Sequence, residues 1–187
     1  MRHFMLACAV LVVLFPQGAR GNDCDWLHER LVVDTAIPVD VTRDERLLAL
    51  VRATAGQMHV TAPLVCEVAS LPHVAFTFLP KERGGVVVTV VDSGVVKTAT
   101  SAALTGLVAH ELGHVVLYVR LGLVPDGTNT TEVEADRIAA QFVGTDSVAE
   151  MLRMLQRVHL PSLGLREQFI GVELQHRVQA LQYQVYR

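Results

Sequence analysis

The chain has 187 residues, of which 51% are hydrophobic, and its formal net charge is −3. A chain of this length fits one domain and can bury a substantial core. The apolar content and the lack of repeats or low-complexity tracts argue against disorder over most of the chain. Lys81 and Lys97 are the two lysines, and no basic stripe is present, which argues against nucleic-acid binding.

The first 21 residues have the layout of a secretory signal peptide. Arg2 precedes an apolar run over residues 4–15, and Ala19 and Gly21 supply small residues at a cleavage site. We therefore predict cleavage near Gly21, a periplasmic or secreted location and a single mature domain over residues 22–187. The alternative is an uncleaved membrane anchor, although the apolar run is short for a bilayer span.

Three cysteines are present, and Cys8 lies in the predicted signal peptide. Because an exported protein meets an oxidising environment, we expect Cys24 and Cys66 to form a disulfide. Such a crosslink would stabilise the fold by roughly 4 kcal/mol by restricting the unfolded chain. The alternative is that Cys24 is a free thiol that blocks a metal ion in a latent form.

The N-terminal part of the mature chain predicts one helix. Thr42 and Glu45 have the spacing of a capping box, and apolar residues then repeat at helical spacing over residues 47–58. Residues 22–70 as a whole are interpreted as either an N-terminal helical segment of the domain or a pro-segment.

Two strands are expected next. β-Branched and aromatic residues predict a strand over residues 73–79, and a second follows over residues 86–91. Residues 92–94 have the composition of a turn. We expect the two strands to pair as an antiparallel hairpin.

The remainder of the chain is helical in pattern. A long apolar helix is predicted over residues 98–121, with Gly122 at its C-cap. Charged residues and histidines interrupt this helix, which favours a core helix over a membrane span. Further helices are predicted over residues 131–143, 147–159 and 165–186, the first two of which begin at capping boxes.

The central feature is His110-Glu-Leu-Gly-His114, an HExxH motif inside the long predicted helix. Residues four apart lie on the same helix face, so both imidazoles can bind one zinc ion. Glu111 is rotated by about 100° and can accept a proton from a zinc-activated water. The motif therefore predicts two zinc ligands, His110 and His114, and a catalytic base, Glu111.

A catalytic zinc ion needs a third protein ligand, and three arrangements can be tested against the sequence. A metzincin would have Gly and His at the third and sixth positions after His114, but this chain has Leu117 and Arg120 there, so the metzincin arrangement is excluded. An aspzincin would have an aspartate at the end of a Gly-Thr-x-Asp motif, but Gly127-Thr-Asn-Thr130 ends in threonine, so the aspzincin arrangement is excluded as well. A gluzincin would supply a glutamate from a downstream helix, and the string Thr131-Glu-Val-Glu-Ala-Asp136 fits this solution.

The three acidic residues of this string have different predicted roles. Glu132 and Asp136 are four residues apart and share a helix face, whereas Glu134 points away from it. We assign Glu132 to the metal and Asp136 to a hydrogen bond with the free ring N–H of a ligand histidine. Glu134 completes a capping box with Thr131.

The two motifs together resemble a known family. His110-Glu-Leu-Gly-His114 followed by Glu132-Val-Glu-Ala-Asp136-Arg137 is similar to the gluzincin zinc metallopeptidases of the CAAX prenyl protease and HtpX-like group, including the small soluble minigluzincins. In that group the first glutamate of the E-x-E-A-D string is the third zinc ligand, which implies this role for Glu132.

An upstream segment resembles the same family more loosely. Residues 73–80 and the pair Gly84-Gly85 are similar to the family's N-A-F-x-x-P-G-G segment, with Val74 at the asparagine position and extra residues inserted. The resemblance covers residues 72–143. The mature chain lacks the family's membrane helices, so the substrates of its membrane-embedded members do not carry over.

We expect an α+β, zincin-like domain in which a small antiparallel hairpin or sheet, the HExxH helix and several packing helices surround a cleft. The predicted function is that of a zinc-dependent endopeptidase with one zinc ion per chain. Zinc would polarise the scissile carbonyl, and Glu111 would pass a proton from water to the leaving amine. A peptide or protein substrate would bind extended along the hairpin edge.

Two other classes of function stay open. An exported binding or assembly protein of chaperone type would keep the zinc site and hold client chains with little or no peptidase activity. A structural domain would bind no metal. Peptide hydrolysis that depends on Glu111 would distinguish a peptidase from the binding or assembly protein. Metal analysis of the purified protein would test the structural alternative. His176 flanks the apolar stripe of the last helix, where a structural role is more typical than a catalytic one.

Overall fold

The computed structural model describes residues 41–42, 44–61, 64–69, 74–78, 87–122, 129–159 and 173–181. The predicted signal peptide and Cys24 lie outside these ranges, and so does the side chain of Cys66. The export and disulfide predictions therefore stay predictions.

All the described strands lie before residue 93, together with α2, and the described elements after that point are helices. In order they are β1 (Val41–Thr42), α2 (Glu45–Gln57), β2 (Leu64–Ala69), β3 (Ala75–Phe78), β4 (Val87–Asp92), α3 (Ser93–Thr98), α4 (Ser101–Leu121), α5 (Asn129–Val143), α6 (Thr145–His159) and a helix over residues 173–181.

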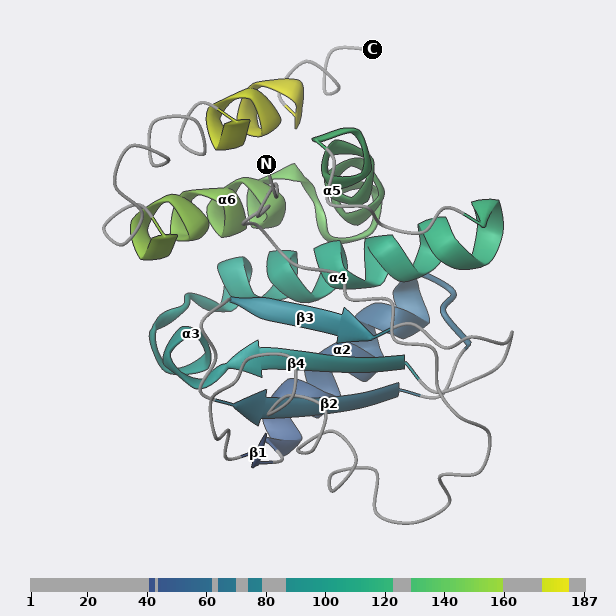
Figure 1. Cartoon of the computed structure of the whole chain (residues 1–187), viewed down its shortest axis with the longest axis vertical. Coiled ribbons are helices and arrows are strands. Elements are labelled where there is room, and N and C mark those ends of the chain that lie inside the picture. The colour runs from purple at the N-terminus through teal and green to yellow at the C-terminus, as the bar shows by residue number, and fades with distance from the viewer. Residues whose placement is uncertain are drawn as a thin grey trace, which may run out of the picture.

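The four strands form one mixed sheet in the order β1-β2-β4-β3. The outer pairs β1–β2 and β3–β4 are antiparallel, whereas β2 and β4 are parallel. Figure 1 shows β3 as the strand that runs alongside α4, with α5 and α6 on the other side of α4 and α2 behind the sheet. The β3 edge of the sheet therefore lies next to the helix that carries the HExxH motif.

The prediction of an α+β domain is wrong, although the predicted antiparallel strand pair is present. Helices account for most of the described residues in regular structure, so the described part of the chain is mainly helical. The β3–β4 pair is antiparallel as expected, but β2 pairs in parallel with β4 and was not predicted. The sequence of β2, Leu-Val-Cys-Glu-Val-Ala, lacks the clean alternation of a half-exposed strand, and strands in parallel pairs commonly read this way.

The start of α2 differs from its prediction. Thr42 belongs to β1, and the N-cap is Asp44, whose carboxylate accepts hydrogen bonds from the backbone N–H groups of Arg46 at 2.9 Å and Leu47 at 3.0 Å. Aspartate is at least as favourable as threonine at an N-cap, and the capping-box pattern therefore predicted the wrong cap residue. The predicted apolar stripe is buried, as expected: Leu47, Leu48, Val51, Ala55 and Met58.

Other boundaries also differ, including the start of α4, which lies at Ser101 rather than at residue 98. The predicted turn at 92–94 is the start of α3, where the Asp92 carboxylate accepts hydrogen bonds from two backbone N–H groups. Helices α5 and α6 each begin two residues before their predicted capping boxes, at Asn129 and Thr145. The C-cap of α4 is confirmed: Gly122 has φ 65° and donates its N–H to the carbonyl of Tyr118.

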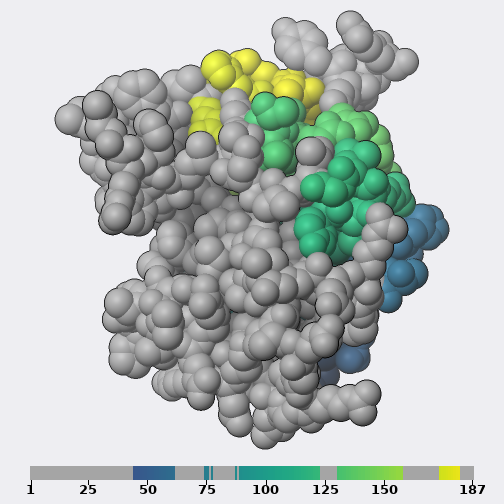
Figure 2. Space-filling view, turned by 45° about the vertical axis from the view of Figure 1, so that its right-hand side comes forward, coloured from purple at the N-terminus to yellow at the C-terminus, as the bar shows by residue number. Residues whose placement is uncertain are grey.

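Helix α4 is the central element of the described fold. It packs most extensively against α5 and α6 and also contacts α2 and β3. Among the described helices, α4 is long and apolar enough to cross a membrane, but 72% of its most apolar stretch is buried within the protein. Gly106 allows α4 and α6 to pack closely, because a Cβ at this position would lie 2.2 Å from the backbone carbonyl oxygen of Ser147 on α6. Figure 2 shows α5, α6 and helix 173–181 gathered at one end of the molecule.

Candidate metal centre

The HExxH residues lie in the buried middle of α4. His110, Glu111 and His114 each have 0% exposure. The two histidines are one turn apart on one face, and their Nε2 atoms are 3.1 Å from each other. Both imidazoles therefore present the same ring nitrogen to one point.

Helix α5 brings a carboxylate to that point. Glu132 is 1% exposed, with Oε2 located 3.3 Å from Nε2 of His110 and Oε1 located 3.3 Å from Nε2 of His114. Neither carboxylate oxygen accepts a hydrogen bond from a described residue, although both are buried. Buried carboxylate oxygens without a hydrogen bond are rare, because their desolvation is costly, and here an ion pair between Oε2 and Nη1 of Arg177 at 3.2 Å offsets only part of that cost.

The approach of α5 to α4 depends on Gly113, which lies between the two histidines in the motif. A Cβ at this position would lie 2.8 Å from the carbonyl oxygen of Ala135 and 3.1 Å from its Cα. Both contacts are with backbone, which cannot rotate away as a side chain can. Glycine therefore allows Glu132 and Asp136 to reach the histidines.

We expect Gly113→Ala to separate α5 from α4 and to weaken metal binding. The substitution should destabilise the fold by about 1–3 kcal/mol, as overpacking commonly does. Gly56→Ala is the matched control, because a Cβ there meets no atom within 4 Å. The control should be neutral or stabilising by up to about 1 kcal/mol. Denaturant unfolding and metal titration of the two variants check this, and equal metal affinities would contradict the role of Gly113.

Asp136 determines how His110 presents its ring. Its Oδ1 lies 2.8 Å from Nδ1 of His110, and the carboxylate is 1% exposed. An ionised carboxylate can only accept, so Nδ1 carries the proton and donates it. The neutral ring then has an unprotonated Nε2 that faces Glu132 and His114. This tautomer is the one that binds a metal ion through Nε2.

The sequence analysis missed Arg177, which completes the cluster from helix 173–181. Its Nε and Nη2 donate to Oδ2 and Oδ1 of Asp136 at 2.7 and 2.9 Å, and its Nη1 lies 3.2 Å from Oε2 of Glu132. Arg177 is 1% exposed. A planar guanidinium that contacts both carboxylates holds them in a fixed relative position.

A signal for Arg177 was present in the sequence. Residues Leu174 and Leu181 are buried, and Arg177 lies three residues after the first and four before the second, on the same helix face. A charged residue on an apolar face needs a buried partner. His176, which the sequence analysis considered for the cleft, is instead exposed.

Electrostatics favour the ionised form of both carboxylates. Burial acts to raise the pKa of Glu132, but hydrogen bonds and charge from His110 and His114, which act when these rings carry a proton on Nε2, outweigh it and hold that pKa well below its usual value. Burial also acts to raise the pKa of Asp136, and the charge of Arg177 together with the hydrogen bond from His110 lowers it. The pKa of Glu173, one turn before Arg177, is raised by burial.

Glu111 faces the sheet. Its Oε2 accepts a hydrogen bond from Oγ1 of Thr77 on β3 at 2.6 Å, whereas its Oε1 is buried without a hydrogen-bond partner among the described residues. Glu111 thus offers one oxygen that is already bonded and one that is free to accept a proton.

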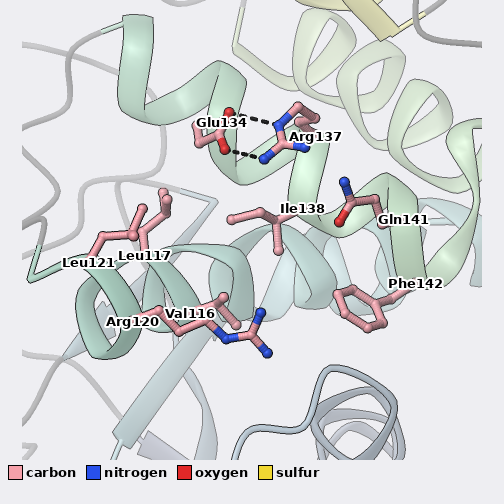
Figure 3. Close-up of a pocket in the computed structure, with 9 residues that line it drawn as sticks. All are labelled: Val116, Leu117, Arg120, Leu121, Glu134, Arg137, Ile138, Gln141 and Phe142. Carbon is pink, nitrogen blue, oxygen red and sulfur yellow. Dashed lines mark hydrogen bonds and ion pairs between the residues drawn. The ribbon is translucent and has the colours of Figure 1, made fainter. Parts of the chain in front are cut away.

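Glu134 points away from this cluster, and its partner is Arg137 rather than the predicted cap. Two guanidinium nitrogens of Arg137, Nε and Nη2, donate hydrogen bonds to the Glu134 carboxylate. Figure 3 shows this pair at the rim of an open pocket of about 200 Å³ between α4 and α5, with Val116, Ile138 and Phe142 among its lining residues. None of the residues that line this pocket is a predicted metal ligand.

His110, His114 and Glu132 together could hold a metal ion. They come from two helices, are fully or almost fully buried, and present three donor atoms to one point. Comparison of the chain with protein-family models, curated proteins and solved structures found no match. The case for function therefore rests on the geometry and chemistry of this centre.

Proposed function

We propose that the protein is a zinc-dependent peptidase of gluzincin type, in which His110, His114 and Glu132 bind the metal and Glu111 is the general base. The observation that carries the proposal is the spacing of the three donors, 3.1 Å between the histidine nitrogens and 3.3 Å from each nitrogen to a carboxylate oxygen. Ligands about 2.0–2.1 Å from a tetrahedral zinc ion lie roughly 3.3–3.4 Å from one another.

The charge of the buried cluster also supports a divalent cation. Glu111, Glu132 and Asp136 are three buried carboxylates, and among the described residues the guanidinium of Arg177 contacts two of them, Glu132 and Asp136. When all four are ionised, two negative charges are left in a buried volume. A divalent ion at the donor point would neutralise them, which is the usual way in which a protein retains unpaired buried charge.

The donor set supports zinc in a catalytic rather than a structural site. Two imidazoles and one carboxylate are the ligands of zinc peptidases that keep a fourth position open, whereas structural sites are closed by four protein ligands, mostly cysteines. The resemblance of both motifs to gluzincins supports the same conclusion. Glu111 adds a base that a structural site does not need.

The chemistry follows from the positions of the protein groups. Zinc bound at this site would supply Lewis acidity toward a water molecule and a carbonyl oxygen. Glu111 Oε1 accepts the proton of the attacking water, and the protonated carboxyl then donates it to the leaving amine. Asp136 and Arg177 hold His110 and Glu132 so that the donor atoms do not rotate away.

The substrate class that fits is an extended peptide. β3 lies at the edge of the described sheet and next to α4, and Thr77 on β3 contacts Glu111. A peptide that added as a further strand to β3 would place its backbone beside the base. Export of the mature chain, as proposed from residues 1–21, would make extracytoplasmic proteins the available substrates.

Metal removal tests this proposal. We expect the purified protein to carry about one zinc ion per chain and to cleave members of a broad peptide library. Chelation should abolish cleavage, and stoichiometric zinc should restore it. Protein that binds zinc and library peptides but cleaves none would favour the client-holding alternative. Protein that takes up no metal on reconstitution would contradict the assignment altogether.

A further inference from the structure

Two threonines form a hydrogen-bonded pair across β3 and β4, directly beside Glu111. Thr77 and Thr89 are register partners in the antiparallel β3–β4 pair, and their Oγ1 atoms are 3.2 Å apart. Thr77 is 0% and Thr89 is 2% exposed. Oγ1 of Thr77 also donates a hydrogen bond to Oε2 of Glu111 at 2.6 Å.

The direction of this chain of hydrogen bonds follows from the number of protons. A threonine hydroxyl has one proton, and an ionised carboxylate can only accept. Thr77 therefore donates to Glu111, and the bond between the threonines must be donated by Thr89. The result is a directed chain in which Thr89 donates to Thr77 and Thr77 donates to Glu111.

This chain makes the two carboxylate oxygens of Glu111 unequal. Oε2 is held by Thr77, and Oε1 has no hydrogen-bond partner among the described residues. An unrestrained glutamate could rotate about its last side-chain bond and exchange the two oxygens. A carboxylate held at Oε2 keeps Oε1 in one position.

We propose that Thr77 is a positioning residue for the general base, which it orients through Oε2, and that Thr89 fixes the hydroxyl of Thr77. This inference rests on the proposed peptidase function. It also links substrate docking to catalysis, because Thr77 belongs to the edge strand on which an extended peptide would add. A peptide bound to β3 stabilises the same backbone that orients the base.

The test compares Thr77→Val, which removes the hydroxyl at nearly constant volume, with Thr77→Ser, which retains it. Thr77→Val should keep its zinc and its KM within about twofold but lose about 10–100-fold in kcat, the range for supporting residues of a reactive centre. Thr77→Ser should recover kcat to within about threefold. Thr54→Val is the control, because Thr54 is also buried but lies on α2, and its kcat should equal that of wild type.

A second readout does not depend on activity. In wild-type protein, Thr77→Val should lower the ratio of folded to unfolded protein by about tenfold, because Glu111 loses a donor. In a Glu111→Leu background, which has no acceptor, the same substitution should change that ratio by less than about twofold. Equal effects in the two backgrounds would show that no hydrogen bond joins the residues and would overturn the inference.

The outcomes separate this inference from the proposed function. Active wild-type protein with an equally active Thr77→Val variant would overturn the positioning role and leave the peptidase assignment intact. Zinc-loaded wild-type protein that hydrolyses no peptide would overturn both. Loss of kcat in Thr77→Val without rescue by Thr77→Ser would also overturn the inference, because it would assign the effect to packing rather than to the hydroxyl.

Discussion

Glu111→Gln is expected to lower kcat for peptide hydrolysis by at least about 10²–10⁴-fold, the contribution of a well-placed general base. The amide has the shape of the carboxylate but cannot accept the proton of the attacking water. Its oxygen can still accept the hydrogen bond from Thr77, so the side chain should stay in place. Steady-state kinetics on a cleaved peptide measures the loss.

The same variant should retain its metal and its fold. Glu111 is not one of the three donors, and the contacts among His110, His114 and Glu132 do not involve it. Zinc content and KM should therefore match those of wild type. An unchanged kcat would remove Glu111 from the reaction. Loss of zinc together with activity would show instead that Glu111 supports the metal.

The second large effect is expected at the third ligand. Glu132→Gln should weaken zinc binding by more than the roughly 10–100-fold that the loss of an outer supporting residue costs. The amide has no negative charge, so the ion pair between Glu132 and Arg177 is lost as well. Zinc titration against a competing chelator measures the change in affinity.

Glu134→Gln is the matched control, two residues away on the same helix. Its side chain is 34% exposed and contacts Arg137, whose side chain is 38% exposed. The Arg137 hydrogen bond lowers the pKa of Glu134, but a solvent-exposed ion pair contributes only about 0–1 kcal/mol. Zinc affinity should stay at the wild-type value. A larger loss in Glu134→Gln than in Glu132→Gln would mean that α5 presents its other face to the metal.

The sequence predicted the elements that carry strong periodic signals. α4 and its Gly122 cap, the burial of the α2 stripe and the antiparallel β3–β4 pair were all anticipated. Local spacing also predicted that His110 and His114 share a helix face. These features depend on residues within one or two turns or strands of each other, and such local order can be read without knowledge of the fold.

What the sequence did not predict depends on contacts between distant segments. β2 pairs with β4, although β3 lies between them in the sequence, and the residue pattern of Leu64–Ala69 does not indicate which strand is its partner. Helix starts were displaced because several residues near each start can cap, as Asp44 does in place of Thr42. The contacts of Arg177 and Thr77 reach 41 and 34 residues along the chain. No local pattern specifies which buried polar groups meet over such separations.

The most direct test of the central claim is anomalous X-ray diffraction from zinc-loaded crystals, with data collected on both sides of the zinc absorption edge. We predict one strong anomalous peak per chain, bounded by Nε2 of His110, Nε2 of His114 and the carboxylate of Glu132, at distances of about 2.0–2.2 Å. Absence of a peak at this point in crystals that contain stoichiometric zinc, or a peak bound by other side chains, would contradict the account.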